Sequence, residues 1–196
     1  MASKGMPILR RKALILATIA EIGEAGSLDV TVSQIAKRAG MSSALAHHYF
    51  GSKDQIFLAA MRHVLETFRL AVSTRLKTAH GPEQRIRAII DASFEPSQFE
   101  REIVAAWLAF YVRALQSRET RRLLQVYARR LHSNLVFNLR QLFDEATAQQ
   151  VAQGLASLID GFYIRHALQD GVPDRAGTRE MVKGYLDLWL ERKERA

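Results

Sequence analysis

The sequence contains no cysteine among its 196 residues. Disulfide bonds, thiolate metal sites and cysteine nucleophiles are therefore excluded. Long apolar runs are also missing, because charged residues interrupt every apolar stretch before it reaches the length of about 20 residues that crosses a bilayer. There is no glycine-rich phosphate-binding loop, internal repeat or low-complexity segment. We therefore expect a cytoplasmic protein with no membrane segment and no cofactor.

Strand patterns are missing as well, since no stretch alternates between apolar and polar residues with period two. Apolar residues instead recur every three or four positions, which is typical of amphipathic helices. Ser97 and Thr147 are the predicted N-caps of the sixth and eighth helices, and residues 1–9 are expected to be a tail. We expect an all-α fold of about nine helices, at residues 10–25, 31–39, 42–50, 53–78, 82–94, 97–115, 117–143, 147–170 and 178–194.

The segment from Thr31 to Lys53 carries the start and stop signals of two short helices and the beginning of a third. Thr31 with Gln34 has the pattern of a capping box, and Gly40 stands where a helix needs a left-handed end residue. Ser42 supplies a new N-cap two residues later. A helix, a short glycine turn and a second short helix form the helix-turn-helix unit, whose second helix enters the DNA major groove.

We expect residues 1–53 to form a three-helix DNA-binding head and residues 54–196 to form a helical body for a ligand and for dimerisation. The formal net charge is +8, and residues 1–53 carry seven basic and three acidic side chains, which favours a polyanionic partner. In the second short helix we expect Ala46, with His47 and His48, to point outward. The candidates for base edges are Ser43, Ala44 and His47, with His47 on a guanine edge. The candidates for phosphate contacts are Thr31, Ser33, Ser42, His48, Tyr49 and Lys53.

A metal site at His47 and His48 is disfavoured, because adjacent helical residues point apart and no third ligand is evident. An enzyme is disfavoured too, since no nucleophile–base spacing, metal box or cofactor loop is present. A helical scaffold with an incidental basic surface remains open. Such a scaffold would bind DNA without sequence preference.

The helix-turn-helix segment resembles the TetR family of bacterial repressors. In that family an aromatic residue, two further residues and a lysine follow the reading helix, as Phe50-Gly51-Ser52-Lys53 do here. The usual ending of the reading helix is Tyr, any residue, His, Phe, whereas this sequence has His47-His48-Tyr49-Phe50. The resemblance implies an all-α homodimer that binds operator DNA and a small-molecule effector, and the departure leaves the base contacts open.

One branch of the family resembles this chain more fully: the choline-responsive repressors of glycine betaine synthesis genes. The joint order and spacing of several short motifs carry this resemblance: His48-Tyr49-Phe50, Phe94 with Ser97-Gln98, Trp107-Leu108-Ala109-Phe110, Arg130-Leu131 with Ser133-Asn134-Leu135, and Leu158-Ile159-Asp160-Gly161. The resemblance implies a choline-like quaternary ammonium effector. A regulator of the same family that senses a lipophilic drug or an acyl ligand is the alternative.

A quaternary ammonium ion is held by aromatic faces and a carboxylate. Trp107 and Tyr111 are four residues apart on one predicted helix and face the same way. Aromatic residues at helical spacing are more often core than ligand site, and Asp160 would equally well pair with Arg165. The candidate ligand-binding residues are Trp107, Tyr111, Phe94, Phe110, Asp91, Asn134, Asp160 and Tyr163, and the helix at 53–78 is the expected connection to the head.

The last two predicted helices are candidates for the dimer interface. The helix at 147–170 has a side of small residues bordered by apolar ones, and a two-fold reader of a palindrome needs a dimer. Burial of the same residues within one chain is the alternative. The candidate interface residues are Leu155, Leu158, Phe162, Tyr185 and Leu188.

Overall fold

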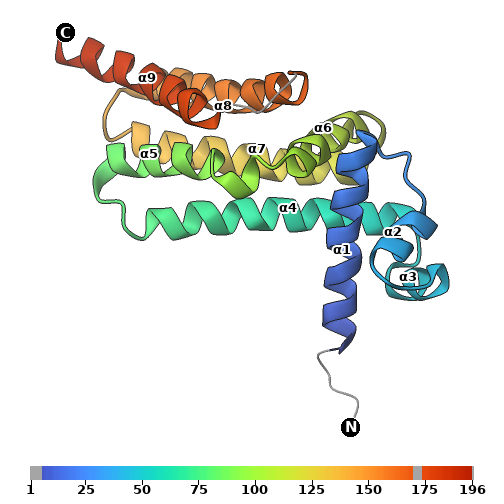
Figure 1. Cartoon of the computed structure of the whole chain (residues 1–196). Helices are drawn as coiled ribbons and strands as arrows, with labels where there is room; N and C mark the ends of the chain where they lie inside the picture. Colours follow the sequence, from blue (N-terminus) through green and yellow to red (C-terminus); the bar gives the residue numbers. More distant parts are fainter. Residues whose placement is uncertain (1–5, 170–173, 196) are drawn as a thin grey trace. The chain divides into compact units, whose positions relative to one another are not determined.

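The computed structural model describes residues 6–169 and 174–195. Within these residues the chain forms nine α-helices and one short 3-10 helix and no strand, so the predicted all-α class is confirmed (Figure 1). The helices are α1 (Met6–Ala25), α2 (Val32–Arg38), α3 (Ser43–Phe50), α4 (Lys53–Leu76), α5 (Gly81–Ser93), η1 (Pro96–Gln98), α6 (Arg101–Gln116), α7 (Arg118–Leu139), α8 (Glu145–Ala167) and α9 (Arg175–Glu194). None of the described helices is both long and apolar enough to cross a membrane.

Two predicted N-caps are wrong, and the first helix is longer than expected. Ser97 lies inside η1, and Glu100 is the N-cap of α6. Asp144 rather than Thr147 caps α8, because its carboxylate accepts a hydrogen bond from the backbone N–H of Thr147 at 3.0 Å. A carboxylate also interacts favourably with the positive end of the helix dipole. The predicted tail is helical from Met6 onward, and residues 1–5 lie outside the described part.

Packing divides the chain into two compact units. The first unit comprises Met1–Glu66 and Glu100–Arg121, so it contains α1, α2, α3, the first part of α4, and α6. The second unit comprises Thr67–Phe99 and Arg122–Ala196, with the rest of α4, α5, η1, α7 from Arg122 onward, α8 and α9. The boundary predicted at residue 53 divides the DNA-binding head from the body that binds a ligand and dimerises. The packing units do not test this division of functions, so it stays a prediction.

In the first unit, α1 packs against both α2 and α6 (Figure 1). Leu14 and Ile22 of α1 are fully buried, as is Ile35 of α2. Ala46 of α3 is also fully buried, so the expectation that it points outward is wrong. Ala46 and Phe50 lie four residues apart and therefore share the inner side of this short helix. The small alanine allows α2 and α3 to pack closely.

In the second unit, α8 and α9 run side by side and α5 packs against α9 (Figure 1). Asp91 of α5 forms an ion pair with Lys183 of α9 at 2.7 Å, and Arg87 pairs with Asp187. The interior is aromatic: the rings of Phe99 and Tyr163 lie 4.8 Å apart between centroids. These contacts explain why α5, α8 and α9 form one packed group.

Candidate DNA interface and effector site

The turn between α2 and α3 has the geometry that its residues predict. The Thr31 side chain accepts a hydrogen bond from the Gln34 backbone, and the Gln34 side chain accepts one from the Thr31 backbone, so the predicted capping box is confirmed. Gly40 has a φ of 67°, a left-handed conformation that favours glycine. Ser42 caps α3 by accepting from the Leu45 N–H at 3.2 Å. The two short helices are therefore locally specified.

Arg11 joins α1 to the end of α3. Its guanidinium donates a hydrogen bond to the Tyr49 carbonyl at 3.1 Å and lies over the Phe50 ring at 4.3 Å. This residue was not among the predicted site residues. The basic cluster at Arg10-Arg11-Lys12 was the available signal, but sequence alone did not show that Arg11 contacts protein. Arg11 therefore positions the reading helix.

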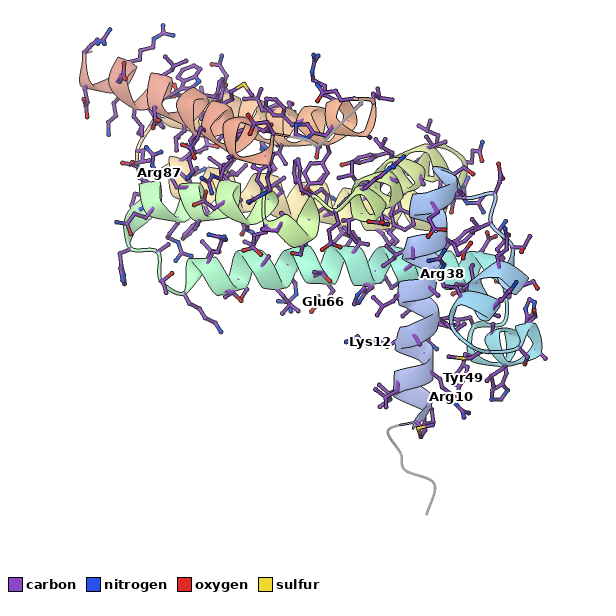
Figure 2. The ribbon with its side chains drawn as sticks, in the orientation of Figure 1. Arg10, Lys12, Arg38, Tyr49, Glu66 and Arg87 are labelled. Carbon is purple, nitrogen blue, oxygen red and sulfur yellow. The ribbon has the colours of Figure 1, made fainter. Side chains whose placement is uncertain are left out.

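Arg38 is a second basic residue of the head whose charge is used within the protein. Its guanidinium binds Glu21 and Glu24 of α1, each at 2.5 Å. The hydrogen bonds to these two carboxylates raise the pKa of Arg38 above its ordinary value. The basic side chains left exposed include Arg10, Lys12 and Lys37. Figure 2 shows Arg10 near the start of α1 and Lys12 projecting from α1.

The predicted DNA-contacting residues differ in their exposure. Ser33, Ala44, His47 and His48 are exposed, and Ser43, Tyr49 and Lys53 are partly exposed. Thr31 and Ser42 are exposed as well, although their hydroxyl groups cap α2 and α3. The exposed surface of α3 therefore carries Ala44 and both histidines, which is compatible with entry into a groove.

The imidazole of His47 contacts a backbone carbonyl through one of its two ring nitrogens. Its Nδ1 atom lies 3.1 Å from the Gly51 carbonyl oxygen. Because a carbonyl oxygen only accepts, Nδ1 carries the proton, and Nε2 of the neutral ring is an acceptor. Guanine presents acceptors in the major groove, whereas adenine and cytosine present amino donors. In this tautomer His47 matches adenine or cytosine, and the expected guanine contact requires a proton on Nε2.

The candidate effector residues of α6 divide into two groups. The rings of Trp107 and Tyr111 are stacked, with centroids 6.0 Å apart and an interplanar angle of 30°. Trp107 is 3% exposed, so its ring is largely shielded from water, whereas Tyr111 is partly exposed. Phe110 instead lines a cavity of about 70 Å³ together with Phe57 and Met61. That volume is well below the range of about 300–1,000 Å³ of small-molecule sites, so Phe110 has a packing function.

The other candidates lie in the second unit. Phe94 is fully buried, and its ring centroid is 6.4 Å from that of Tyr163, whose hydroxyl donates to the Ser93 carbonyl. The Asp91 carboxylate is already occupied by Lys183. Asn134 is exposed on α7, and Asp160 is partly buried on α8. Phe94 and Tyr163 are therefore brought together, whereas Asn134 is not part of that cluster.

His166 belongs to the same aromatic cluster and was not predicted. Its ring lies 5.0 Å from the ring of Phe99, between centroids. Its Nε2 atom lies 3.0 Å from the Thr178 hydroxyl, which donates to the Asp174 carbonyl. Burial lowers the pKa of His166 below its ordinary value of 6.5, so the ring is neutral at neutral pH. A single histidine on an apolar helix side gives no sequence signal for this contact.

The candidate dimer residues also differ in how exposed they are. Leu155 is fully buried within its own chain and has no surface left for a partner copy. Leu158, Phe162 and Tyr185 are partly exposed, and Leu188 is 67% exposed. Tyr185 packs on Gly154, where an added Cβ would lie 2.1 Å from its hydroxyl oxygen. The two helices, with the C-cap residue of α8, also expose three further large apolar side chains: Ile164, Leu168 and Met181.

Ion pairs connect α4 with α6 and with the start of α7 in the first unit. Asp54 pairs with Arg113 at 2.7 Å, and Arg62 pairs with Glu119 at 3.2 Å. Residues so far apart in sequence give no signal of their pairing. No group of three or more His, Cys, Asp or Glu side chains in the described part of the chain could hold a metal ion.

Comparisons with known proteins identify the family. Residues 14–60 match the family described as bacterial regulatory proteins, tetR family, and residues 82–191 match the BetI-type transcriptional repressor, C-terminal. The HTH-type transcriptional regulator BetI of Brucella suis is 53% identical over 190 residues, which cover 97% of this chain and 96% of that protein. The regulator of the same name from Agrobacterium fabrum is 49% identical over 191 residues, with 97% and 93% covered.

A solved structure has the same fold. It is a transcriptional regulator from Saccharomonospora viridis in complex with choline, with a TM-score of 0.79 and 20% identity, and the alignment covers 90% of this chain and 95% of that chain. The curated relatives are transcriptional regulators rather than enzymes or scaffolds. This chain is therefore a member of the TetR family of DNA-binding transcriptional repressors, and its C-terminal part is of the BetI type.

Proposed function

We propose that this repressor controls glycine betaine synthesis genes and leaves its operator when a choline-like quaternary ammonium ligand binds. The stacked Trp107–Tyr111 pair on α6 is the observation that carries the ligand class. A quaternary ammonium ion has no N–H donor, so aromatic faces favour it over water. The BetI-type match and the choline complex of a regulator with the same fold support this ligand. A repressor of chromosomal genes acts in the cytoplasm.

The connection from α6 to the reading helix lies within the first unit. α6 packs against α1, and Arg11 of α1 holds the end of α3 through Tyr49 and Phe50. α4, the connection expected from the sequence, is joined to α6 by the Asp54–Arg113 ion pair. A ligand that prefers one position of α6 therefore shifts the head, and the change in operator affinity cannot exceed that preference.

Genome-wide capture of the bound DNA with and without choline tests this function. We expect a palindromic site beside glycine betaine synthesis genes that is occupied without choline and vacated with it. The neutral carbon isostere of choline should not release the site, because it has no cation to attract the aromatic rings. Release by acyl compounds or lipophilic drugs, but not by choline, would favour the alternative ligand class.

A further part of the proposal is a homodimer held by α8 and α9. These two helices and the C-cap of α8 expose Leu168, Met181 and Leu188, and exposed large apolar side chains are characteristic of interaction sites when they adjoin. A palindromic operator needs a reader with two-fold symmetry. Leu158, Phe162 and Tyr185 are only partly covered by their own chain and complete the proposed interface.

Leu188→Glu should convert the dimer to a helical monomer, because the dimer would otherwise bury an unpaired carboxylate. Sedimentation velocity at micromolar concentration measures the oligomeric state, and circular dichroism measures the helix content. Phe137→Glu is the matched control, because Phe137 is 65% exposed on α7, outside the proposed interface. A dimer that persists in Leu188→Glu but dissociates in Phe137→Glu would move the interface to α7.

Lys53→Ala should weaken the binding of all DNA sequences alike and reduce the salt slope by about one unit per subunit, since each subunit loses one phosphate contact. Lys53 begins α4, where the helix dipole disfavours a cation; its ammonium lies 5.2 Å from the Phe57 ring centroid and is partly exposed, so it is available to a phosphate. His47→Ala is the matched comparison and should instead change base preference with little change in slope. Fluorescence anisotropy over a salt series measures both. Reversed effects would exchange the two proposed roles.

A further inference from the structure

The second unit carries an open cleft of about 740 Å³ between the α7–α8 turn, the start of α8 and the last turns of α9. This volume lies within the range of about 300–1,000 Å³ of small-molecule sites. Trp107 and Tyr111 belong to the first unit, so the cleft is separate from the proposed effector pair. Its lining combines aromatic rings, cations and amides: Arg140, Gln141, Leu142, Phe143, Asp144, Thr147, Gln150, Trp189, Arg192 and Lys193.

Two cations of the cleft lie over aromatic rings. The Arg192 guanidinium is 5.7 Å from the ring centroid of Trp189, and the Lys193 ammonium is 6.0 Å from that of Phe143. Neither cation forms an ion pair with any carboxylate that the structure describes, whereas Arg140 pairs with Glu145 at 2.5 Å. Two positive charges in the cleft are therefore uncompensated.

The one carboxylate that lines the cleft does not neutralise these charges. Asp144 accepts hydrogen bonds from the Thr147 hydroxyl at 2.6 Å and from the Thr147 backbone N–H at 3.0 Å. These bonds lower the pKa of Asp144 below its ordinary value. Its charge is directed into the first turn of α8. The net positive charge of the cleft consequently repels cationic ligands and attracts anions.

We propose that this cleft binds a small organic anion with an apolar body, such as an aromatic or medium-chain carboxylate. A guanidinium stacked on an indole ring keeps N–H donors at its edge, where a carboxylate accepts two parallel hydrogen bonds. The Lys193 ammonium adds a second positive charge. The apolar body lies against Trp189 and Phe143, and the Gln150 amide supplies a further polar contact. The proposal depends only on the second unit and not on the proposed function.

The experiment uses the full-length protein labelled with 5-fluorotryptophan. The chain has two tryptophans, so two fluorine resonances are expected, and Trp189→Phe assigns them. Sodium benzoate and sodium octanoate should shift the Trp189 resonance saturably at millimolar concentration and leave the Trp107 resonance in place. Sodium chloride at the same ionic strength, benzyl alcohol and octanol should have no such effect, because they lack the carboxylate or the apolar body.

Arg192→Gln with Lys193→Gln should raise the apparent dissociation constant at least about tenfold, since charge-assisted hydrogen bonds are lost. The matched control is Arg129→Gln with Arg195→Gln, which removes the same charge from exposed positions outside the cleft. Equal effects of the two double variants, or an equal shift with chloride, would overturn the proposal. A Trp189 resonance that responds to protein dilution but not to either carboxylate would assign the cleft to contact between copies, which also overturns it.

Discussion

Replacing Trp107 with alanine should abolish the release of operator DNA by choline while leaving operator affinity without choline nearly unchanged. Trp107 stacks on Tyr111 and is 3% exposed, so a cation bound against this ring would be largely desolvated. One desolvated cation–π contact contributes up to about 2 kcal/mol. A tenfold loss of operator affinity requires about 1.4 kcal/mol of preference between two states. The free energy lost with this one ring is therefore large enough to remove the response to choline.

Removing a buried tryptophan also costs about 3–5 kcal/mol of folding stability, so a second pair of variants separates packing from ligand binding. Trp107→Phe should retain part of the response, because it retains a smaller aromatic face. Trp107→Leu should lose the response, because it retains only apolar volume. Fluorescence anisotropy of labelled operator over a choline series measures release, and thermal unfolding measures stability. An unchanged choline concentration for half release in Trp107→Leu would place the cation site elsewhere.

The helix-turn-helix segment was predictable because its determinants are local. Thr31 and Gln34 are three residues apart, and the left-handed turn at Gly40 depends on that residue alone. The same reasoning failed at Thr147, because Asp144 three residues earlier offered a competing cap. It failed at Ala46 because burial on a short helix depends on the neighbouring helices rather than on side-chain type. Local sequence signals therefore identify where a helix lies better than they identify which side of that helix is buried.

The candidate effector site was predictable only in part. The four-residue spacing predicted that Trp107 and Tyr111 would meet, and their rings do stack. Spacing alone could not distinguish this pair from Phe110, which lines a small cavity that includes neither Trp107 nor Tyr111. Arg11 and Tyr49 are 38 residues apart, so their hydrogen bond had no signal in the sequence. The contact that joins α1 to the reading helix therefore became visible only in the fold.

The close packing of α1 on α6 leads to the second large expected effect. Gly23→Ala should destabilise the protein, because the added Cβ would lie 2.5 Å from the Glu102 Cα atom. Alanine in a helix is otherwise about 1 kcal/mol more favourable than glycine, so the substitution would stabilise α1 if space were available. Overpacking costs about 1–3 kcal/mol and is severe here because the obstacle is backbone. The expected sign is therefore a lower melting temperature.

The same variant should weaken the coupling between choline and operator, because it displaces α6 from the helix that carries Arg11. Gly26→Ala is the matched control: Gly26 has a φ of 62° and nothing within 4 Å of an added Cβ. Alanine in that left-handed conformation costs about 1–2 kcal/mol without touching α6. The ratio of operator affinities with and without choline should therefore fall in Gly23→Ala and stay unchanged in Gly26→Ala. If Gly23→Ala raises the melting temperature, the α1–α6 contact has room for a methyl group at this position. If both variants lose the ratio equally, global destabilisation rather than this contact carries the coupling.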